Sequence, residues 1–371
     1  MRWRVLGGGR SYAISQAILA RKSHDENPEL RTVTVKTGED ALLGKIARQF
    51  AHTSRTVAAA FPVGIGDDAA IYAPRAGCET ILTCDWFLEG THFLRDKHPA
   101  DAVGWKCLAR AISDVAAMGG VPRCFLLSLA LPETHLGPWL DAFLGGLRRA
   151  SQRFHCALAG GDTTKRRDIL INITIIGEVP TGKAVLRRRA RPGDILYVSG
   201  RLGEAERGLR LLESRRGLAG EKDRTLRRHL YPHPRLALGS WLREKRLATA
   251  MMDLSDGLSS DLPRLCLASG VGARIEASRL PAVQVSADGQ TREISPIQLA
   301  LHGGDDYELL FAVPRRKTKF VPRSLKGVRL TAIGEITRRR EIVLAEPGGR
   351  EVPLKPGGWD PFRHSKEKRQ R

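Results

Sequence analysis

The sequence lacks several features that would place it outside the cytoplasm. No apolar run approaches the ~20 residues that a membrane span requires. The N-terminus carries Arg2 and Arg4, but its short apolar stretch is broken by glycines at 7–9 and is a poor secretory signal. The six cysteines are scattered without a Cys-x-x-Cys pair, which argues against a zinc site or a disulfide framework. Five of the six lie in apolar or β-like surroundings, so we expect a cytoplasmic protein with reduced, largely buried thiols and no contact with a membrane.

The familiar nucleotide-binding signatures are also missing. The segment 38–45 has the wrong glycine spacing for a P-loop, and Ile46 stands where Ser or Thr should follow the lysine. There is no Gly-x-Gly-x-x-Gly turn and no Gly-x-Ser-x-Gly nucleophile elbow. A function that uses a nucleotide must therefore depend on other residues.

Acidic residues are in the minority. The chain of 371 residues holds 61 Lys and Arg against 40 Asp and Glu, a net charge of +21. Basic runs occur at 187–191, 315–319, 338–340 and in the tail, but aromatic residues do not alternate with them as they do on a base-stacking surface. A solvated basic surface is therefore favoured over nucleic-acid binding. A catalytically silent nucleic-acid-binding protein remains an alternative, which salt-sensitive binding without ATP hydrolysis would support.

The order of patterns predicts two mixed domains. Residues 1–36 show no sustained periodicity and are expected to form a disordered extension. Strand-like and helical runs then alternate, and turns at 180–182 and 191–194 bracket a domain boundary. We predict an N-terminal domain at 37–182, a C-terminal α/β domain at 183–362 and a basic tail at 363–371. The fold class is α/β (α+β), with helices packed on sheets.

The predicted elements follow the hydrophobic periodicity. Helices are expected at 41–50, 100–118, 136–153, 204–215, 236–245 and 258–269. Strands are expected at 79–83, 124–131, 156–159, 169–179, 195–199, 273–275, 307–313, 330–336 and 342–345.

Six short segments concentrate acidic residues beside glycine, serine or threonine. They are GIGDD at 64–68, TCD at 83–85, SD at 113–114, GGDTT at 160–164, DLSDG at 253–257 and GGDDYE at 303–308. Any one of them is more often a turn or a helix cap. Together, carboxylates gathered in turns repel one another and indicate a divalent cation, and oxygen ligands of this kind suit Mg²⁺ on a transferring phosphoryl group. The GGDTT segment is interpreted as a loop that cradles phosphate while Asp162 holds the metal.

The order and wording of these motifs resemble the thiamine-monophosphate kinase family. The motifs are GIGDDAAI, TCDWFLEGTHF, KCLARAISDVAAMGGVP, GGDTT, RARPGD, HPR, MDLSDGLSSDL and GGDDYELLF, and the resemblance covers residues 38–362. It implies the aminoimidazole ribonucleotide synthetase-like fold, with N-terminal strands that form a dimer-interface sheet or barrel in a homodimer. It also implies that ATP and Mg²⁺ serve the conversion of thiamine monophosphate to thiamine diphosphate.

The resemblance assigns roles residue by residue. The implied metal ligands are Asp68, Thr83, Cys84, Asp85, Asp114, Asp162, Asp253 and Asp256, and the implied ATP contacts are Gly161, Asp162, Arg187 and Ser255. The implied substrate contacts are His92, Asp305 and Trp359. Cys84 replaces a more usual Thr, and Asp305 stands where the family often has Glu. A histidine such as His92 is usually structural, and Trp359 could equally anchor the C-terminal segment.

The implied reaction is direct in-line transfer of the γ-phosphoryl group. The acceptor phosphate is ionised at neutral pH, so no catalytic base is assigned, and metal ions with fixed charges would offset the repulsion between the anionic reactants. The alternative within the superfamily is an ATP-using synthetase that acts on a different acceptor.

Overall fold

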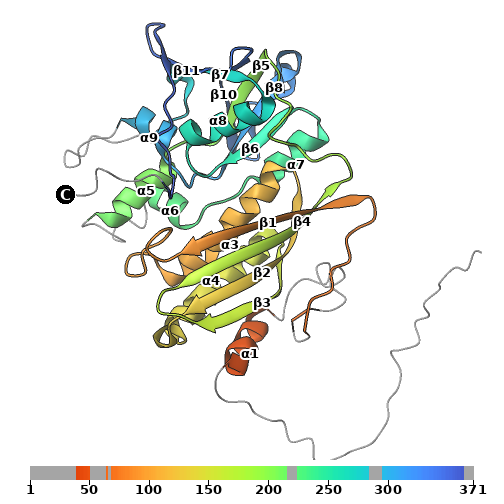
Figure 1. Ribbon diagram of the computed structural model, residues 1–371, viewed down its shortest axis with the longest axis vertical. Helices are drawn as coiled ribbons and strands as arrows, with labels where there is room; N and C mark the ends of the chain where they lie inside the picture. Colours follow the sequence, from red (N-terminus) through yellow and green to blue (C-terminus); the bar gives the residue numbers. More distant parts are fainter. Residues whose placement is uncertain (1–38, 51–63, 66–67, 215–223, 284–294, 363–371) are drawn as a thin grey trace, which may run out of the picture.

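The computed structural model describes residues 39–50, 64–65, 68–214, 224–283 and 295–362. Two mixed α/β regions lie one above the other in Figure 1. The predicted extension at 1–36 and the predicted basic tail at 363–371 lie outside the described residues. Trp359 and its neighbours up to Phe362 are described and belong to the second region.

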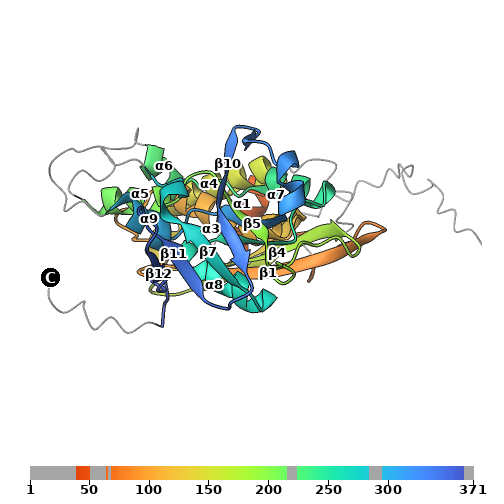
Figure 2. The ribbon, with the colours of Figure 1, turned by 90° about the horizontal axis from the view of Figure 1, so that it is seen from above.

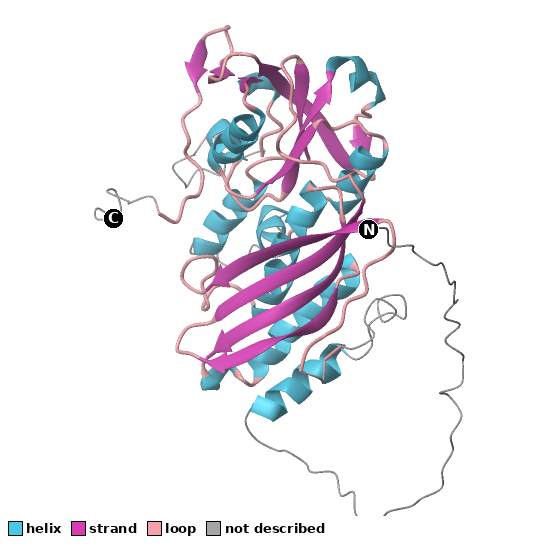
Figure 3. Cartoon of the chain, turned by 45° about the vertical axis from the view of Figure 1, so that its right-hand side comes forward, coloured by secondary structure: helices cyan, strands magenta, loops and turns pink. Residues whose placement is uncertain are grey.

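The first region is a four-stranded sheet backed by helices. Its elements are α1 (Glu39–Phe50), β1 (Cys78–Leu88), α3 (Ala100–Ala117), β2 (Val121–Leu131), η1 (Glu133–His135), α4 (Pro138–Phe154), β3 (Ala157–Lys165) and β4 (Leu170–Pro180). The strand order is β1-β4-β2-β3, and only the β2–β3 pair is parallel. Figure 3 shows that helices cover one face of this open sheet, while no described helix covers the other.

The two faces of the sheet differ because apolar residues alternate along its strands. Ile171, Ile173 and Ile175 of β4 are fully buried against the helices. On the opposite face, Leu82 is 71% exposed and Trp86 is 55% exposed. A period of two therefore builds one packed face and leaves an apolar face open.

The helices α3 and α4 touch through glycines. A Cβ atom at Gly104 would lie 2.0 Å from the carbonyl oxygen of Phe143, and one at Gly146 would lie 1.9 Å from that of Asp101. No larger residue fits at either position, so the two backbones approach closely along this contact.

The second region is built on a larger sheet. Its strands are β5 (Asp194–Ser199), β6 (Ala250–Leu254), β7 (Gly272–Glu276), β8 (Glu308–Pro314), β9 (Ser324–Leu325), β10 (Val328–Thr337), β11 (Ile342–Ala345) and β12 (Glu351–Pro353). Its helices are α5 (Glu204–Glu213), α6 (Arg224–Leu230), α7 (Leu236–Glu244), α8 (Leu258–Ser269), η3 (Ala277–Arg279), α9 (Pro296–His302) and η4 (Arg315–Phe320). The strand order is β12-β11-β7-β10-β5-β8-β6, with β9 beside β10 and only β11–β7 parallel.

The regions meet along α3, which packs against α7 and β6 as well as against its own sheet. Figure 2 shows α3 lying beneath the second sheet when the molecule is seen from above. At this contact the indole Nε1 of Trp105 donates a hydrogen bond of 2.8 Å to the carbonyl oxygen of Pro232. A charged residue on α3 can therefore face both regions at once.

The predicted fold class is confirmed at the level of two mixed α/β regions. All the strands and helices predicted from periodicity are present, but several boundaries differ. The strand β6 and the short helices α6 and α9 were not predicted. The four strands of the first region do not close into a barrel within the chain. No described helix is long and apolar enough to cross a membrane.

Three acidic segments do not lie in turns, as predicted, but in regular structure. Asp85 is in β1, Asp162 in β3 and Asp253 in β6. The prediction of turns was wrong because ladder hydrogen bonds of neighbouring strands hold these segments extended.

Candidate functional site

Four carboxylates from both regions gather beside α3. Asp85 lies on the helix-covered face of β1, Asp114 is near the end of α3, and Asp253 ends β6 just before Asp256. The hydroxyl of Thr83, on the same face of β1, donates a hydrogen bond of 2.5 Å to Asp114 Oδ2. The structure thus brings five of the predicted metal-ligand candidates close to one another.

The environment of this acidic cluster disfavours negative charge in the absence of a cation. Burial raises the pKa of Asp85 to about 6, against the opposing effect of Arg110 and with a further contribution from Asp114. Burial and the Asp114 carboxylate raise the pKa of Asp253 to about 7. A divalent cation would relieve both effects.

The donor set fits Mg²⁺ in chemistry but is not closed around an ion. Among the described residues, no group of three or more His, Cys, Asp or Glu side chains is positioned to hold a metal. Mg²⁺ commonly takes one or two carboxylates and completes its shell with water and substrate phosphate oxygens. The acidic cluster therefore suits an ion that arrives with a nucleotide.

A cavity of about 670 Å³ adjoins this cluster. It collects all three predicted substrate contacts, His92, Asp305 and Trp359, together with Ser255 and Asp256. These residues come from the loop after β1, the loop after β6, the segment before β8 and the end of the second region. We call this cavity the acceptor pocket.

Asp305 is held rigidly at the wall of the acceptor pocket. Its backbone has a φ of 65°, and its Oδ2 lies 2.7 Å from Nζ of Lys106, a lysine of α3 that is only 1% exposed. The hydroxyl of Tyr307 donates a hydrogen bond of 2.7 Å to Oδ1. Burial opposes ionisation, but Lys106, His229 and Arg110 hold the pKa of Asp305 well below its usual range.

His92 and Trp359 both line the acceptor pocket. The backbone N–H of Leu88 donates a hydrogen bond of 3.0 Å to His92 Nδ1, and burial lowers the pKa of His92 to about 4, so the ring is neutral at pH 7. The backbone N–H of Trp359 donates a hydrogen bond of 2.9 Å to the carbonyl oxygen of Asp256. The indole is 45% exposed, so anchoring of the C-terminal segment and stacking on a ligand are compatible.

The turn that carries Ser255 and Asp256 is fixed by a carboxylate that the sequence prediction did not include. Asp261 Oδ2 accepts hydrogen bonds from the backbone N–H of Ser255 at 3.1 Å and of Asp256 at 3.0 Å. Asp256 in turn pairs with Arg264 at 2.5 Å. Asp261 therefore positions the two residues at the entrance to α8.

The remaining nucleotide candidates lie on the other side of the sheet. Asp68, Gly161 and Asp162 line a second cavity, of about 1030 Å³, which we call the open-face cavity. The strand register places Asp162 in one row with Ser128, Asn172 and Trp86, three strands from β1. At about 4.8 Å per strand, this row separates Asp162 from β1 by roughly 14 Å.

Two further candidates stand apart from both cavities. Cys84 is exposed and shares the open face with Leu82, because it alternates with Thr83 and Asp85 along β1. Arg187 is exposed in the segment between the regions, where its carbonyl oxygen accepts a hydrogen bond of 2.8 Å from the Ser269 hydroxyl.

The GGDTT segment is a strand rather than a phosphate-binding loop, and Gly161 has a packing role there. A Cβ atom at Gly161 would lie 1.9 Å from the carbonyl oxygen of Leu127. The glycine is therefore required for the close parallel pairing of β3 with β2, whatever ligand the segment binds.

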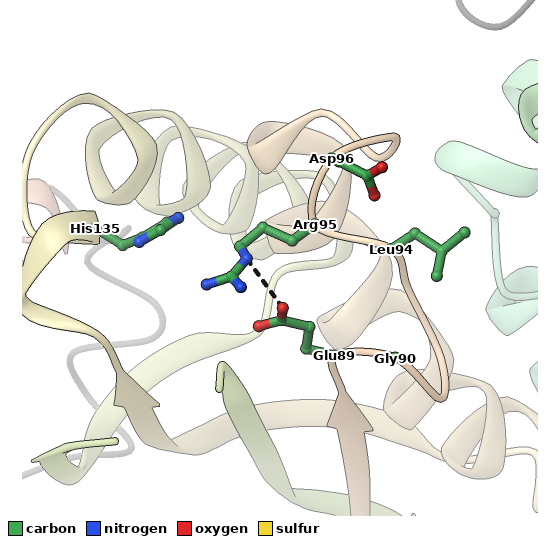
Figure 4. A pocket seen from close by; sticks show the side chains of 6 residues that line it. All are labelled: Glu89, Gly90, Leu94, Arg95, Asp96 and His135. Carbon is green, nitrogen blue, oxygen red and sulfur yellow. Dashed lines mark ion pairs between the residues drawn. The ribbon is translucent and has the colours of Figure 1, made fainter. Parts of the chain in front are cut away.

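A smaller hollow of about 370 Å³ lies over the loop that follows β1 (Figure 4). Glu89, Gly90, Leu94, Arg95, Asp96 and His135 line it. Arg95 Nε pairs with Glu89 Oε1 at 2.9 Å, so these opposite charges satisfy each other. It contains none of the predicted site residues.

Sequence reasoning also missed two cations of α3. Arg110 lines the acceptor pocket, and Lys106 contacts Asp305 in its wall. With Asp114 they recur every four residues along a helix that is mostly buried. This spacing places all three on one face of the helix. Charged residues at i, i+4 and i+8 in an apolar helix were the signal available in the sequence.

Both regions of the chain match known protein families in sequence. Residues 66–179 match the family model of the AIR synthase related protein, N-terminal domain, and residues 191–345 match that of the C-terminal domain. Thiamine-monophosphate kinase of Escherichia coli strain K12 is 39% identical over 307 residues, covering 81% of this chain and 92% of that protein. The enzyme of the same name from Bacillus subtilis strain 168 is 33% identical over 308 residues, covering 81% and 94%.

Solved structures agree with these matches. The crystal structure of thiamine-monophosphate kinase from Stenotrophomonas maltophilia K279a superposes with a TM-score of 0.71 at 35% identity, covering 82% of this chain and 95% of that one. A structure of AaThiL complexed with AMPPCP and TMP gives 0.66 at 33% identity, covering 88% and 97%. Because identity of 39% and 33% to the Escherichia coli and Bacillus subtilis enzymes extends over 81% of the chain, the chain belongs to the thiamine-monophosphate kinase family.

Proposed function

We propose that this chain transfers the γ-phosphoryl group of ATP to thiamine monophosphate, giving thiamine diphosphate and ADP. One observation carries the proposal: the acceptor pocket joins His92, Asp305 and Trp359 to the edge of the acidic cluster around Asp85. A relative with 33% identity has been solved with an ATP analogue and TMP. The predominantly free, buried cysteines suit a reducing compartment, and we place the reaction in the cytoplasm.

The residues of the acidic cluster would hold Mg²⁺. When bound, the ion would neutralise charge on the transferring phosphoryl group and on the two anionic reactants. Asp85, Asp114, Asp253 and Asp256, with the Thr83 hydroxyl, would supply its protein ligands. Proton competition at the carboxyls whose pKa is raised predicts that the ion binds more tightly above pH 7 than below it.

The protein's own contribution is to bring two anions into line. In this proposal Trp359 covers the aromatic part of the acceptor, while the ionised Asp305 faces its cationic or hydrogen-bond-donating groups. The acceptor phosphate attacks in its ionised form, so no side chain needs to remove a proton. The neutral His92 is a positioning contact rather than a base.

The test is a coupled assay of the purified protein with Mg·ATP and thiamine monophosphate, free thiamine or an aminoimidazole ribonucleotide precursor. Thiamine diphosphate and ADP should form only with thiamine monophosphate. Asp85→Asn should abolish turnover while the circular dichroism spectrum and the unfolding midpoint stay close to those of the wild type. A fully active Asp85→Asn variant would refute the site, and product from another acceptor would favour the alternative synthetase.

We further propose that the open face of the first sheet is covered by a second copy. The exposed Leu82 and Trp86 leave an apolar face that a soluble monomer would seldom expose. Two four-stranded sheets related by a twofold axis along the strands would close into a barrel, with β3 of one copy beside β1 of the other. This arrangement would bring Asp68, Gly161 and Asp162 of one copy toward Cys84 and Asp85 of its partner, where they could bind ATP.

Leu82→Lys should convert the dimer to monomer in sedimentation velocity, because a cation replaces a buried apolar contact.

Complementation gives a sharper test. Asp85→Asn and Asp162→Asn should each be inactive, yet a co-expressed mixture should regain roughly a quarter of the wild-type activity, since each mixed dimer keeps one intact site. No recovery would mean that both carboxylates act within one chain. The predicted ATP contacts of Ser255 and Arg187 remain proposals that ATP-binding measurements on alanine variants would test.

A further inference from the structure

Arg110 is placed differently from the other cations around the acceptor pocket. It lies on α3 one turn before Asp114, its side chain is 15% exposed, and it lines the pocket. Its guanidinium carbon stands 5.5 Å over the centre of the Phe87 ring. The side chain is therefore fixed by packing on one side and faces the cavity on the other.

Against the effect of burial, Tyr307, Asp85 and Asp305 raise the pKa of Arg110, but Asp85 does not form a close pair with its Nε. Its Nε lies 3.5 Å from Asp85 Oδ2, which is longer than a charge-assisted hydrogen bond of about 2.8 Å. This buried Nε has no hydrogen-bond partner among the described residues. By contrast, Lys106 makes a contact of 2.7 Å with Asp305, and Arg264 contacts Asp256 at 2.5 Å. Because this Nε is closed to the cavity, a ligand in the pocket would meet the guanidinium through its terminal Nη groups.

The position of Arg110 defines what such a ligand would be. The residue stands between the acidic cluster, where the phosphoryl group would be transferred, and the pocket wall formed by His92, Asp305 and Tyr307. An acceptor seated in the pocket would place its own phosphate at this junction. An arginine keeps its charge at any pH the protein meets, and its planar fork matches phosphate oxygens.

We propose that Arg110 binds the phosphate of the acceptor and makes the pocket prefer a phosphorylated acceptor to the same molecule without phosphate. This inference rests on the proposed function, because it assigns a specificity residue to that reaction. The competing role is purely structural: Arg110 would only neutralise Asp85. The two roles differ in what a variant changes, since a counter-ion affects all ligands whereas a phosphate contact affects only the phosphorylated one.

The experiment measures binding of thiamine monophosphate and of thiamine by titration calorimetry, with Mg²⁺ present and ATP absent. The wild type should bind the monophosphate more tightly. Arg110→Met should weaken monophosphate binding about 10- to 100-fold, the range of a hydrogen bond between charged groups, and leave thiamine binding within about twofold. Arg110→Lys, which keeps the charge but loses the fork, should show a smaller loss with the same selectivity.

Arg149→Met is the matched control. Arg149 pairs with Asp101 of α3 at 2.5 Å, so this variant also removes an ion pair from the same helix, but it lies outside the three cavities. It should leave both affinities unchanged. Binding of Mg·ADP to Arg110→Met should also be unchanged, which separates a contact with the acceptor from a contact with the nucleotide.

Equal loss of affinity for both ligands, or no loss for either, would overturn the assignment of Arg110. If Arg110→Met does not fold, the comparison of the two ligands with Arg110→Lys decides in the same way. Failure of the proposed function is distinguishable, because the wild type itself would then neither bind nor phosphorylate thiamine monophosphate. A wild type that turns over, with unselective Arg110 variants, would refute this inference alone.

Discussion

The buried pair of Lys106 and Asp305 allows a quantitative prediction that is independent of catalysis. Lys106 is 1% exposed and its Nζ lies 2.7 Å from Asp305 Oδ2. Lys106→Met removes the cation and leaves a carboxylate facing a protein interior. Removing one partner of a buried ion pair costs about 3–5 kcal/mol. Because the Asp305 side chain is 34% exposed, water compensates in part, and we expect a loss of about 2–3 kcal/mol in the free energy of unfolding.

Urea unfolding at pH 7.5, followed by far-UV circular dichroism, measures this loss. The double variant Lys106→Met/Asp305→Asn should recover part of it, with a coupling free energy of at least about 1.5 kcal/mol in the mutant cycle. The pH dependence has a defined sign. The pKa of Asp305 is depressed in the folded protein, so its contribution is present above the ordinary aspartate pKa of about 3.9 and is lost as the pH falls below it.

In Lys106→Met the acidic loss of stability should therefore be shallower than in the wild type. Two results would refute the reasoning: a loss below about 0.5 kcal/mol, or losses for the two single variants that simply add. Either result would mean that the pair is solvated in solution and does not fix the pocket wall.

Two further predictions concern packing and pH. Gly104→Ala should destabilise the protein by at least about 1–3 kcal/mol, because the new Cβ would lie 2.0 Å from the Phe143 carbonyl oxygen. Thermal unfolding measures this loss. An unchanged midpoint would show that α3 and α4 can separate without cost. Burial lowers the pKa of His98 to about 4, so the folded state binds its proton less readily than the unfolded state and stability should fall as the pH falls from about 6.5 toward 4. His98→Asn should reduce that loss by about 2 kcal/mol between pH 7 and pH 5 in urea unfolding, and an unaltered pH profile would contradict the burial of the neutral ring.

Periodicity was sufficient to predict most of the fold. A fully buried strand such as β6 was missed because Ala250–Leu254 has no alternation of apolar and polar residues, and a five-residue run of this kind looks the same in a helix or a strand. The short helices α6 and α9 are stabilised by tertiary contacts of a few buried residues, which local propensity does not report.

The motifs point to the acidic residues of the candidate site but not to their arrangement. The motifs identified Asp85, Asp114 and Asp253, and the structure brings them together. The side of the sheet on which Asp162 lies depends on strand register, which no local pattern gives when the parallel partner is distant in sequence. Lys106 and Arg110 were missed because a sequence with many positive charges does not show which of them are buried.

The glycine contacts of α3 also limit how the protein can move. A Cβ at Gly104 would meet α4, and one at Gly239 of α7 would lie 2.1 Å from the carbonyl oxygen of Ala116, farther along α3. Helix α3 is thus held by close backbone contacts to α4 in the first region and to α7 in the second. A shift of α3 along its axis would have to break these contacts together. Access to the acceptor pocket should then depend on the loops that carry His92 and Trp359, while the charged face of α3 stays in place.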